Sequence, residues 1–435
     1  MRAILIGILW AVGAFAQSFN GFSLGMAGND VAITRGVHSI GANPANVAVP
    51  RGNAFELNVF DANIAVFNNA FSYHSYQTFF VSDGEENYWD SDKKQDFLDL
   101  VPDDGLKVDT EIRTNVLGLA FNNFALAVYP VLFGEVSNPE IKTLLDMALN
   151  GINFTKDYKL YLSNLAQGSG LGAVAVSLNY AYPLPIKQYL PDFSFASVGI
   201  GVNYYIGLGG AEVEEANAHV VRQQFDGYET VESSTNFSAL VAYPDDATPA
   251  GKGRSYDFGL SALYKEKWFV SLSFLNVAGK VHFSTNTERY IFEGKSTAYY
   301  YEDIDSSVTS VDQSTDTTLT VDPFDMRVPA YMRLGVSYYF RKNLLFTAEW
   351  RQGLNRALNN STTPRLGLGV QYKPLWWLPL RSGIAVGGKT GFLMGFGLGL
   401  DFKFVSFNLS YAMKNALWPT HSEGLLLGAN LMFRL

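Results

Sequence analysis

The sequence contains no cysteine. This excludes a disulfide framework, a thiolate metal site and a cysteine nucleophile. Its five histidines are scattered, and no two have the four-residue spacing of a metal-ligand pair on a helix. A Gly-x-Ser-x-Gly elbow, a glycine-rich phosphate loop and an HExxH motif are also missing. We therefore expect neither metal nor cofactor, and we do not expect an enzyme.

Charged residues and long apolar runs are scarce too. Asp, Glu, Lys and Arg make up only 17% of the chain, which is little for a water-exposed surface. Beyond the N-terminus no run of about 18 apolar residues occurs, so transmembrane helices are not expected. The net charge of −9 argues against a nucleic-acid partner. What is abundant is aromatic residues, 14% of the chain, and 40 glycines, a composition typical of the alternating strands of a membrane barrel.

The N-terminus, MRAILIGILWAVGAFAQS, has the features of an export signal. Arg2 is followed by an apolar stretch, and Ala14-Phe15-Ala16 fits the small-x-small cleavage pattern before Gln17. A buried N-terminal strand or helix is the competing interpretation. We predict a signal peptide over residues 1–16 and an exported mature protein.

The C-terminal third shows the clearest strand pattern. In GFLMGFGLGLD (391–401), Phe392, Met394, Phe396 and Leu398 alternate with smaller residues, and the last stretch, 424–435, alternates in the same way. Successive side chains of a strand point to opposite faces, so each segment has one apolar and one small or polar face. A soluble β-sandwich alternates as well. However, the strands are about 10 residues long, as a tilted membrane strand must be, and their polar faces carry Gly, Ser and Asn in place of Lys and Glu.

Working back from Leu435, the pattern predicts about 14 antiparallel strands, and any number from 12 to 16 is compatible with it. The predicted fold is all-β, a transmembrane outer-membrane barrel. The predicted strands span 53–66, 108–121, 123–133, 170–183, 193–208, 253–264, 267–283, 328–340, 343–354, 363–373, 379–388, 391–401, 404–414 and 424–435. Short connections then alternate with mostly long ones, such as 209–252 and 284–327. Short periplasmic turns and longer outer loops are typical of outer-membrane barrels.

The long loops include helical insertions. Residues 138–152 are predicted to form a helix with Asn138 as its N-cap, and 82–105 to be partly helical. The Ser/Thr/Asp-rich stretch 303–322 is interpreted as a mobile outer loop. It lacks the Gly and the terminal Glu of an EF-hand loop.

Several charged residues fall on inward positions of the predicted strands. They are Asp257, Arg333, Glu349, Arg351, Arg365, Arg381 and Asp401. A charge on the lipid face near the midplane costs roughly 2–4 kcal/mol, so the lumen is the favoured location. Two interpretations stay open. The charges brace the wall, or they hold the N-terminal segment or meet a ligand carboxylate.

Aromatic residues are placed where a barrel meets the two membrane interfaces. The predicted aromatic girdle consists of Trp268, Tyr338, Trp376 and Trp377 on the short-turn side, and Trp350 and Trp418 on the long-loop side.

Between the export signal and the first strand lies SLGMAGNDVAITRGVHSIGANPANVAVP (23–50), which has neither alternation nor a helical stripe. Its phrases Ser23-Leu24-Gly25-Met26-Ala27-Gly28 and Asn43-Pro44-Ala45 resemble the N-terminus of the outer-membrane long-chain fatty acid transporter superfamily, FadL/PorV-like barrels. PRLGLGVQYK, LPLRSGIAVGG and GFGLGLD in the second half resemble an uncharacterised Bacteroidetes-type branch of these barrels. The end, Phe433-Arg434-Leu435, departs from the terminal aromatic residue that many barrels carry.

The resemblance implies a 14-stranded barrel (53–435) with residues 17–52 forming a lumenal hatch, or plug. The hatch residues carried over are Gly25, Met26, Gly28, Asn43, Pro44 and Ala45. The expected function is passive uptake of a hydrophobic or amphipathic small molecule across the cell outer membrane, gated by the hatch. A non-transport scaffold or secretion-system partner is the alternative. Expected partners are outer-membrane lipid, the barrel-assembly machinery through the C-terminal strand, and a hydrophobic ligand.

Overall fold

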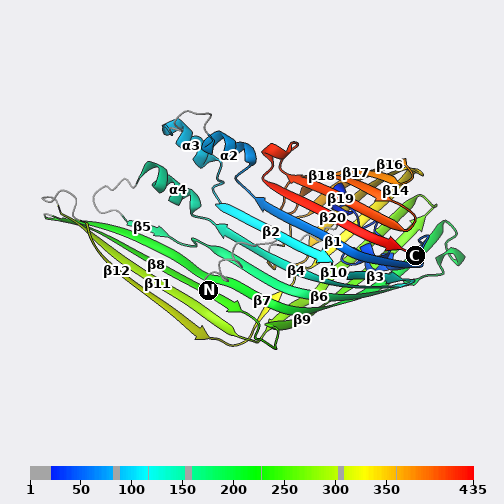
Figure 1. Ribbon diagram of the computed structural model, residues 1–435, viewed down its shortest axis with the longest axis horizontal. Coiled ribbons are helices and arrows are strands. Elements are labelled where there is room, and N and C mark those ends of the chain that lie inside the picture. The colour runs from blue at the N-terminus through cyan, green and yellow to red at the C-terminus, as the bar shows by residue number, and fades with distance from the viewer. Residues whose placement is uncertain are drawn as a thin grey trace.

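The wall of the protein is a closed antiparallel sheet, seen here in a computed structural model that describes residues 21–81, 89–115, 117–151, 159–226, 228–301, 308–358 and 360–435. The first strand pairs with the last, from Glu56 opposite Arg434 to Phe67 opposite Gly424, so the wall closes on itself (Figure 1). It has 14 strand positions, as predicted. The predicted signal peptide, 1–16, lies outside the described residues.

The wall strands follow chain order, with β2 and β3 sharing one position. They are β1 (Phe55–Asn68), β2 (Leu106–Asn115), β3 (Leu117–Phe121), β4 (Phe124–Asn138), β6 (Gln167–Pro183), β7 (Phe193–Phe225), β9 (Gly251–Tyr264), β10 (Trp268–Phe283), β14 (Tyr331–Arg341), β15 (Leu344–Gly353), β16 (Arg365–Leu375), β17 (Leu378–Gly387), β18 (Leu393–Asp401), β19 (Val405–Lys414) and β20 (Gly424–Arg434).

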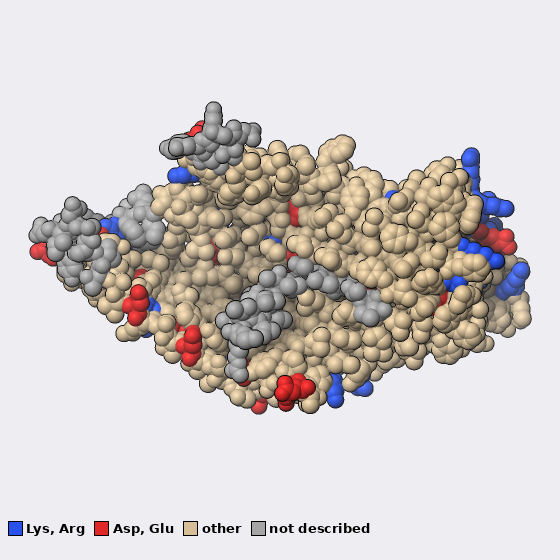
Figure 2. All heavy atoms as spheres, in the orientation of Figure 1, with Lys and Arg blue, Asp and Glu red and all other residues tan. Residues whose placement is uncertain are grey.

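Side chains alternate across this wall in the sense opposite to that of a soluble protein. On β19, Leu409 is 52% exposed on the outer face, whereas its neighbour Ser410 is 3% exposed on the inner face. In Figure 2 the charged side chains lie mainly at the right-hand end, towards the left-hand end and along the lower edge, and broad parts of the visible face between them are uncharged. An outward apolar band with a polar interior is the organisation of a membrane barrel. Among the described residues, no helix is both long and apolar enough to span a bilayer.

Two stretches predicted as loops are instead strands that extend the sheet beyond the barrel. β7 continues to Phe225, and its outer part pairs with β8 (Tyr228–Ala242) on one side and with β5 (Lys159–Leu162) on the other. The next strand, β11 (Thr287–Tyr301), pairs with β8, and β12 (Val308–Thr320) pairs with β11. β13 (Phe324–Arg327) continues the β14 position. The loop predictions for 209–252, 284–327 and 303–322 were therefore wrong over these strands. Their Ser/Thr-rich composition looked loop-like, but long strand pairing satisfies their backbone groups.

The α-helices lie at the end of the barrel away from the C-terminus (Figure 1). They are α2 (Tyr73–Phe80), α3 (Ser91–Asp99) and α4 (Ile141–Asn150), and the short 3-10 segment η5 (Pro419–His421) connects β19 to β20 at the same end. The 3-10 segment η4 (Ile186–Gln188) connects β6 to β7 at the opposite end, where the C-terminus lies. α4 lies within the predicted helix, but Asn138 is not its N-cap. Asn138 ends β4, and its side chain accepts the backbone N–H of Glu140, which occupies the cap position.

Candidate functional site: the hatch and its contacts with the wall

The hatch, residues 17–52, is described from Gly21 onward and lies against the inner faces of many wall strands. It consists of turns and three 3-10 segments, η1 (Leu24–Met26), η2 (Gly36–Ser39) and η3 (Pro44–Ala48). The backbone is left-handed at Ala27, Gly28, Gly36 and Gly41. The predicted hatch residues Gly25, Met26, Gly28, Asn43, Pro44 and Ala45 are all buried. A segment without a sheet of its own must have its backbone polar groups satisfied by its surroundings.

Serines of the wall provide hydrogen-bond partners for several of these backbone groups. The hydroxyls of Ser197, Ser273, Ser337 and Ser410, on four different strands, donate to the hatch carbonyls of Ala45, Ala42, Ala32 and Gly21 over 2.6–3.1 Å. Each of these serines is at most 3% exposed. The inward polar face of the strands is thus used to bind the hatch.

Asn43 anchors η3 to the wall. It is extended, with φ −158° and ψ 115°, and its Oδ1 accepts the N–H of Ala45 at 2.8 Å, which caps η3. Its Nδ2 lies 3.1 Å from the carbonyl oxygens of both Leu260 and Leu272, a facing pair on β9 and β10. The side chain fits because the neighbouring wall residue is Gly259, where a side-chain carbon would lie 1.8 Å from Oδ1.

Asn29 makes the same kind of contact on the opposite half of the hatch, and sequence reasoning missed it. Its Nδ2 lies 3.2 Å from the carbonyl oxygen of Leu368 and 3.0 Å from that of Ile384, a facing pair on β16 and β17. The wall residue beside it is again a glycine, Gly367. Two asparagines of the hatch therefore dock at two separate glycine positions of the wall.

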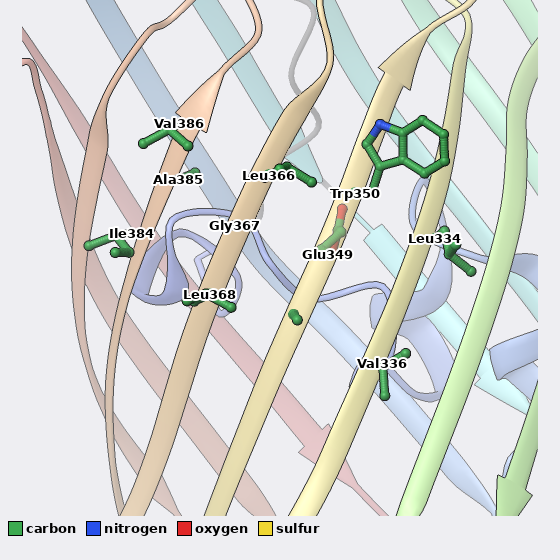
Figure 3. A pocket seen from close by; sticks show the side chains of 11 residues that line it. Leu334, Val336, Glu349, Trp350, Leu366, Gly367, Leu368, Ile384, Ala385 and Val386 are labelled. Carbon is green, nitrogen blue, oxygen red and sulfur yellow. The ribbon is translucent and has the colours of Figure 1, made fainter.

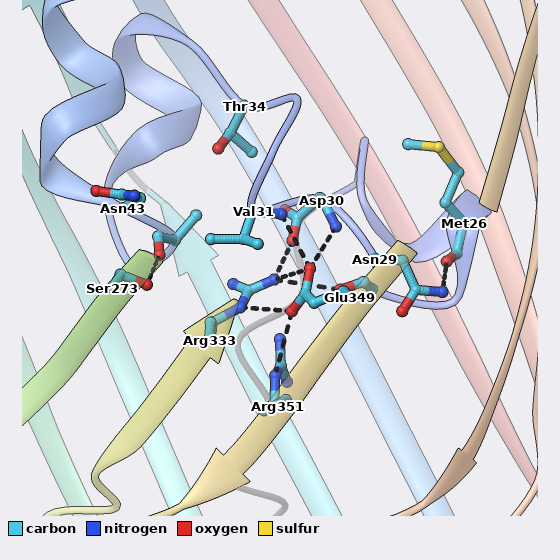
Figure 4. Close-up of polar contacts among 12 residues, drawn as sticks. Met26, Asn29, Asp30, Val31, Thr34, Asn43, Ser273, Arg333, Glu349 and Arg351 are labelled. Carbon is cyan, nitrogen blue, oxygen red and sulfur yellow. Dashed lines mark hydrogen bonds and ion pairs between the residues drawn. The ribbon is translucent and has the colours of Figure 1, made fainter. Parts of the chain in front are cut away.

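Between these two anchors lies a buried ion cluster (Figure 4). Arg333 Nε is 2.7 Å from Glu349 Oε1, and the Arg333 guanidinium also contacts the Asp30 carboxylate of the hatch. The backbone N–H groups of Asp30 and Val31 donate to Glu349 Oε2 at 2.9 and 3.0 Å. The side chains of Arg333, Asp30 and Glu349 are each 1% exposed. Buried charges require such partners, because the loss of one leaves another uncompensated.

Two further predicted charges extend this cluster. Arg351 lies beside Glu349, 3.8 Å from Nε to Oε1, and the Arg365 guanidinium donates to the Ala27 carbonyl. The wall contributes Arg333, Arg351 and Arg365 as neighbours across β14, β15 and β16. The hatch contributes one carboxylate and its carbonyls, so its electrostatics complement those of the wall.

The remaining predicted charges lie elsewhere. Asp257 accepts the backbone N–H of Asn276 at 2.7 Å, where β10 is irregular. Arg381 donates to Gln371 and Asn408 at 2.8 Å each, and its guanidinium lies 4.2 Å from the ring centre of the hatch residue Phe22. Asp401 pairs with Lys373 and Arg434 near the short-turn end. Asp257 and Asp401 thus belong to the wall and not to the ion cluster.

The predicted girdle residues face outward. On the short-turn side, the rings of Trp268 and Tyr338 lie 4.4 Å apart on paired strands, and Trp377 stacks on Phe402. Trp376 and Trp418 are 70% and 72% exposed.

A lysine at the long-loop end makes a contact that no pattern in the sequence predicts. Lys389 lies in the turn between β17 and β18. Its Nζ is 2.8 Å from Asp109 Oδ1 on β2 and also contacts Glu135 on β4. In the wall, β18, β19, β20 and β1 lie between that turn and β2. The turn therefore reaches across the barrel, and we call Lys389 with these two carboxylates the mouth bridge.

Comparison with known proteins gives a family but no activity. The model of a family of unknown function, DUF5723, matches residues 44–411, and the chain belongs to this family. No curated protein matches the sequence. Among solved structures, similarity is found to a TodX deletion mutant, a monoaromatic hydrocarbon channel, with 13% identity and a TM-score of 0.48, covering 96% of this chain and 99% of that one. The CymD monoaromatic hydrocarbon channel has 13% identity and a TM-score of 0.47, and the match covers 97% of this chain and 99% of that one. A Pseudomonas aeruginosa FadL homologue has 13% identity and a TM-score of 0.42, and the match covers 97% of this chain and 98% of that one.

Among the described residues, no group of three or more His, Asp or Glu side chains is arranged to hold a metal ion. The chemistry of the site is that of docking: buried hydrogen bonds and ion pairs between a hatch and a wall.

Proposed function

We propose that the protein is an outer-membrane channel for the passive uptake of a hydrophobic or amphipathic small molecule, and that the hatch gates it. The observation that carries this proposal is how the hatch is held. Side-chain hydrogen bonds and ion pairs fix it to the wall, and between Gly21 and Gly52 no residue of the hatch is part of a strand. Such contacts can be exchanged for water without breaking the sheet.

The inner wall supports the same proposal. The buried apolar residues Val37, Ile40 and Val47 of the hatch pack in one cluster with wall residues such as Ala175 and Tyr205. The hatch therefore fills space that a ligand would have to cross, so uptake requires it to shift. The protein as described is the closed form of the proposed channel.

The outer helices support a hydrophobic ligand. Phe79, Phe80, Trp89 and Phe97 on and beside α2 and α3 form a cluster with ring centres 5.1–5.8 Å apart. Phe79 and Phe97 are buried, whereas Phe80, Tyr73 and Tyr76 on α2 are 53–57% exposed, and these exposed rings give an apolar molecule a place to leave water.

The experiment is removal of the hatch. A variant lacking residues 19–48 is reconstituted in vesicles, and the efflux of a small solute is compared with that from vesicles with the full chain. Heat-dependent mobility on a gel confirms that both barrels are folded. We expect faster efflux from the deletion variant. Equal efflux from two folded barrels would show that the segment is not a plug.

A second candidate function, a scaffold or secretion-system partner, has one observation in its favour. β12 pairs with β11 along one edge only among the described strands, so its other edge is open. Open strand edges can accept a strand from another protein. A protein that copurifies with the wild type, and is lost when β12 is removed, would favour this function over uptake.

A further inference from the structure

The outer face of the wall carries a groove of about 460 Å³ across strands β14 to β17 (Figure 3). Two rows of outward side chains cross these strands side by side. One row is Leu334, Trp350, Leu366 and Val386, and the other is Val336, Ala348, Leu368 and Ile384. The groove lies among these rows.

A single small residue creates the depth. Ala348 stands between Val336 and Leu368 across the strands, and between Phe346 and Trp350 along β15. All four of these neighbours are larger, so the missing volume at Ala348 opens a depression between them. Leu366 and Leu368 are 58% and 59% exposed, more than any other leucine on the outward face of the wall strands. They line the hollow instead of packing across it.

The lining offers carbon and almost nothing polar. Glu349 contributes to the lining, but its carboxylate is 1% exposed and is bonded on the inner side to Arg333 and to the hatch backbone. Apart from the indole N–H of Trp350, the lining thus provides no partner for a charged or hydrogen-bonding group. Ala348 lies in the middle of β15, far from the level where lipid headgroups meet a barrel. The lining therefore favours a hydrocarbon occupant at this depth.

The groove has a rigid base. Its residues Leu368 and Ile384 have their carbonyl oxygens within 3.2 and 3.0 Å of Asn29 Nδ2, and Gly367, which also lines the groove, packs directly on Asn29. The hatch therefore contacts the inner face of the wall at the same strands whose outer face carries the groove. A preformed groove binds a flexible chain at a smaller entropic cost than one that must be ordered.

We infer that this groove binds one acyl chain of an outer-membrane lipid. The inference rests on the membrane location of the proposed function. Within a bilayer the competing environment is also hydrocarbon, so the gain on binding comes from closer packing in the groove.

Native mass spectrometry tests the inference with phosphatidylethanolamine as the probe. The full chain, purified in detergent, is mixed with the lipid, and the number of lipids retained at rising collision energy is recorded. Ala348→Phe fills the groove, and Ala262→Phe makes the same change at another outward alanine, on β9. We expect Ala348→Phe to retain one lipid fewer than the wild type, and Ala262→Phe to retain as many. Equal retention by both variants, or a copurifying polypeptide that Ala348→Phe displaces, overturns the inference.

Tryptophan quenching provides a second measurement, which does not require a substitution that fills the groove. A variant with Trp350 as its only tryptophan is placed in vesicles whose phosphatidylethanolamine is brominated in mid-chain. We expect stronger quenching than for a variant that keeps only Trp268, because Trp268 is the first residue of β10 whereas Trp350 lies inside β15, two residues from Ala348. Quenching of Trp350 no stronger than that of Trp268 contradicts the groove. The absence of quenching in both variants contradicts the membrane location itself, so the two failures are distinguishable.

Discussion

The carboxamide of Asn29 occupies the space that a side chain at Gly367 would need. A carbon added at Gly367 would lie 1.7 Å from Asn29 Oδ1, and one added at Gly259 would lie 1.8 Å from Asn43 Oδ1. Neither wall glycine has a left-handed backbone. These positions are therefore explained by close approach and not by backbone conformation. At each of two positions, an asparagine of the hatch packs against a glycine of the wall.

The first prediction follows from this fit. Gly367→Ala forces Asn29 out of its site, and overpacking of this kind costs about 1–3 kcal/mol. Since the wall ladder is unchanged, the cost falls on hatch docking. We expect faster trypsin cleavage after Arg35, a hatch residue whose guanidinium lies 3.9 Å from the ring centre of Phe269. Gly170→Ala is the control, because a carbon there meets only the Phe133 carbonyl oxygen at an ordinary 3.7 Å. Equal cleavage rates for the two variants would contradict the fit.

The second prediction concerns the ion cluster. Glu349→Gln keeps the shape of the side chain but removes the charge that faces Arg333 and Arg351, and breaking a buried pair in this way costs about 3–5 kcal/mol. We expect a lower urea midpoint in vesicles and a more accessible hatch. Asp192→Asn breaks an exposed pair with Lys265 and serves as the control, with an expected loss below about 1 kcal/mol. A loss for Glu349→Gln as small as that of the control would show that the cluster does not stabilise the docked hatch.

Sequence reasoning recovered the wall because each strand carries its own signal, an alternation of about ten residues that does not depend on its neighbours. It singled out Asn43 because Asn43-Pro44-Ala45 resembles a family phrase, and Pro44 also restricts the residue before it to an extended conformation. Asn29 lacks any such local mark, and its role arises only from the approach of Gly367, more than 300 residues away in the chain. The extension formed by β8, β11 and β12 was missed because its strands lack a clear apolar face, so pairing alone identifies them.

The third prediction is a dependence of hatch docking on pH. Burial lowers the pKa of the hatch residue His38, which stacks on Phe22, and the nearby Arg434 and Arg381 lower it further, while Asp401 opposes them. A released hatch binds a proton near the ordinary pKa of about 6.5, and the docked hatch binds it only at lower pH. Docking is therefore undisturbed above that value and weakens as the pH falls below it.

Trypsin is not suited to acidic buffers, so the measurement uses a fluorophore attached to a cysteine introduced at Ser39. We expect its emission to shift towards that of a water-exposed probe between about pH 6.5 and pH 5. His38→Asn removes the titrating group and should leave the emission constant over that range. The same shift in both proteins would assign the effect to another group.

The last prediction separates the mouth bridge from the hatch. Lys389→Met removes the ammonium that joins Asp109 and Glu135 across the long-loop end, while keeping most of the length of the side chain. The two carboxylates, on neighbouring strands, then repel each other, and the turn between β17 and β18 loses its attachment to the far wall. None of the hatch contacts described above includes this turn, so we expect them to be kept. We therefore expect faster labelling by a membrane-impermeant thiol reagent of a cysteine introduced at the buried Thr390, with no change in cleavage after Arg35. Lys403→Met, at a short turn, should change neither rate. If cleavage after Arg35 rose together with labelling in the Lys389 variant, bridge and hatch would form one coupled closure instead of two independent ones.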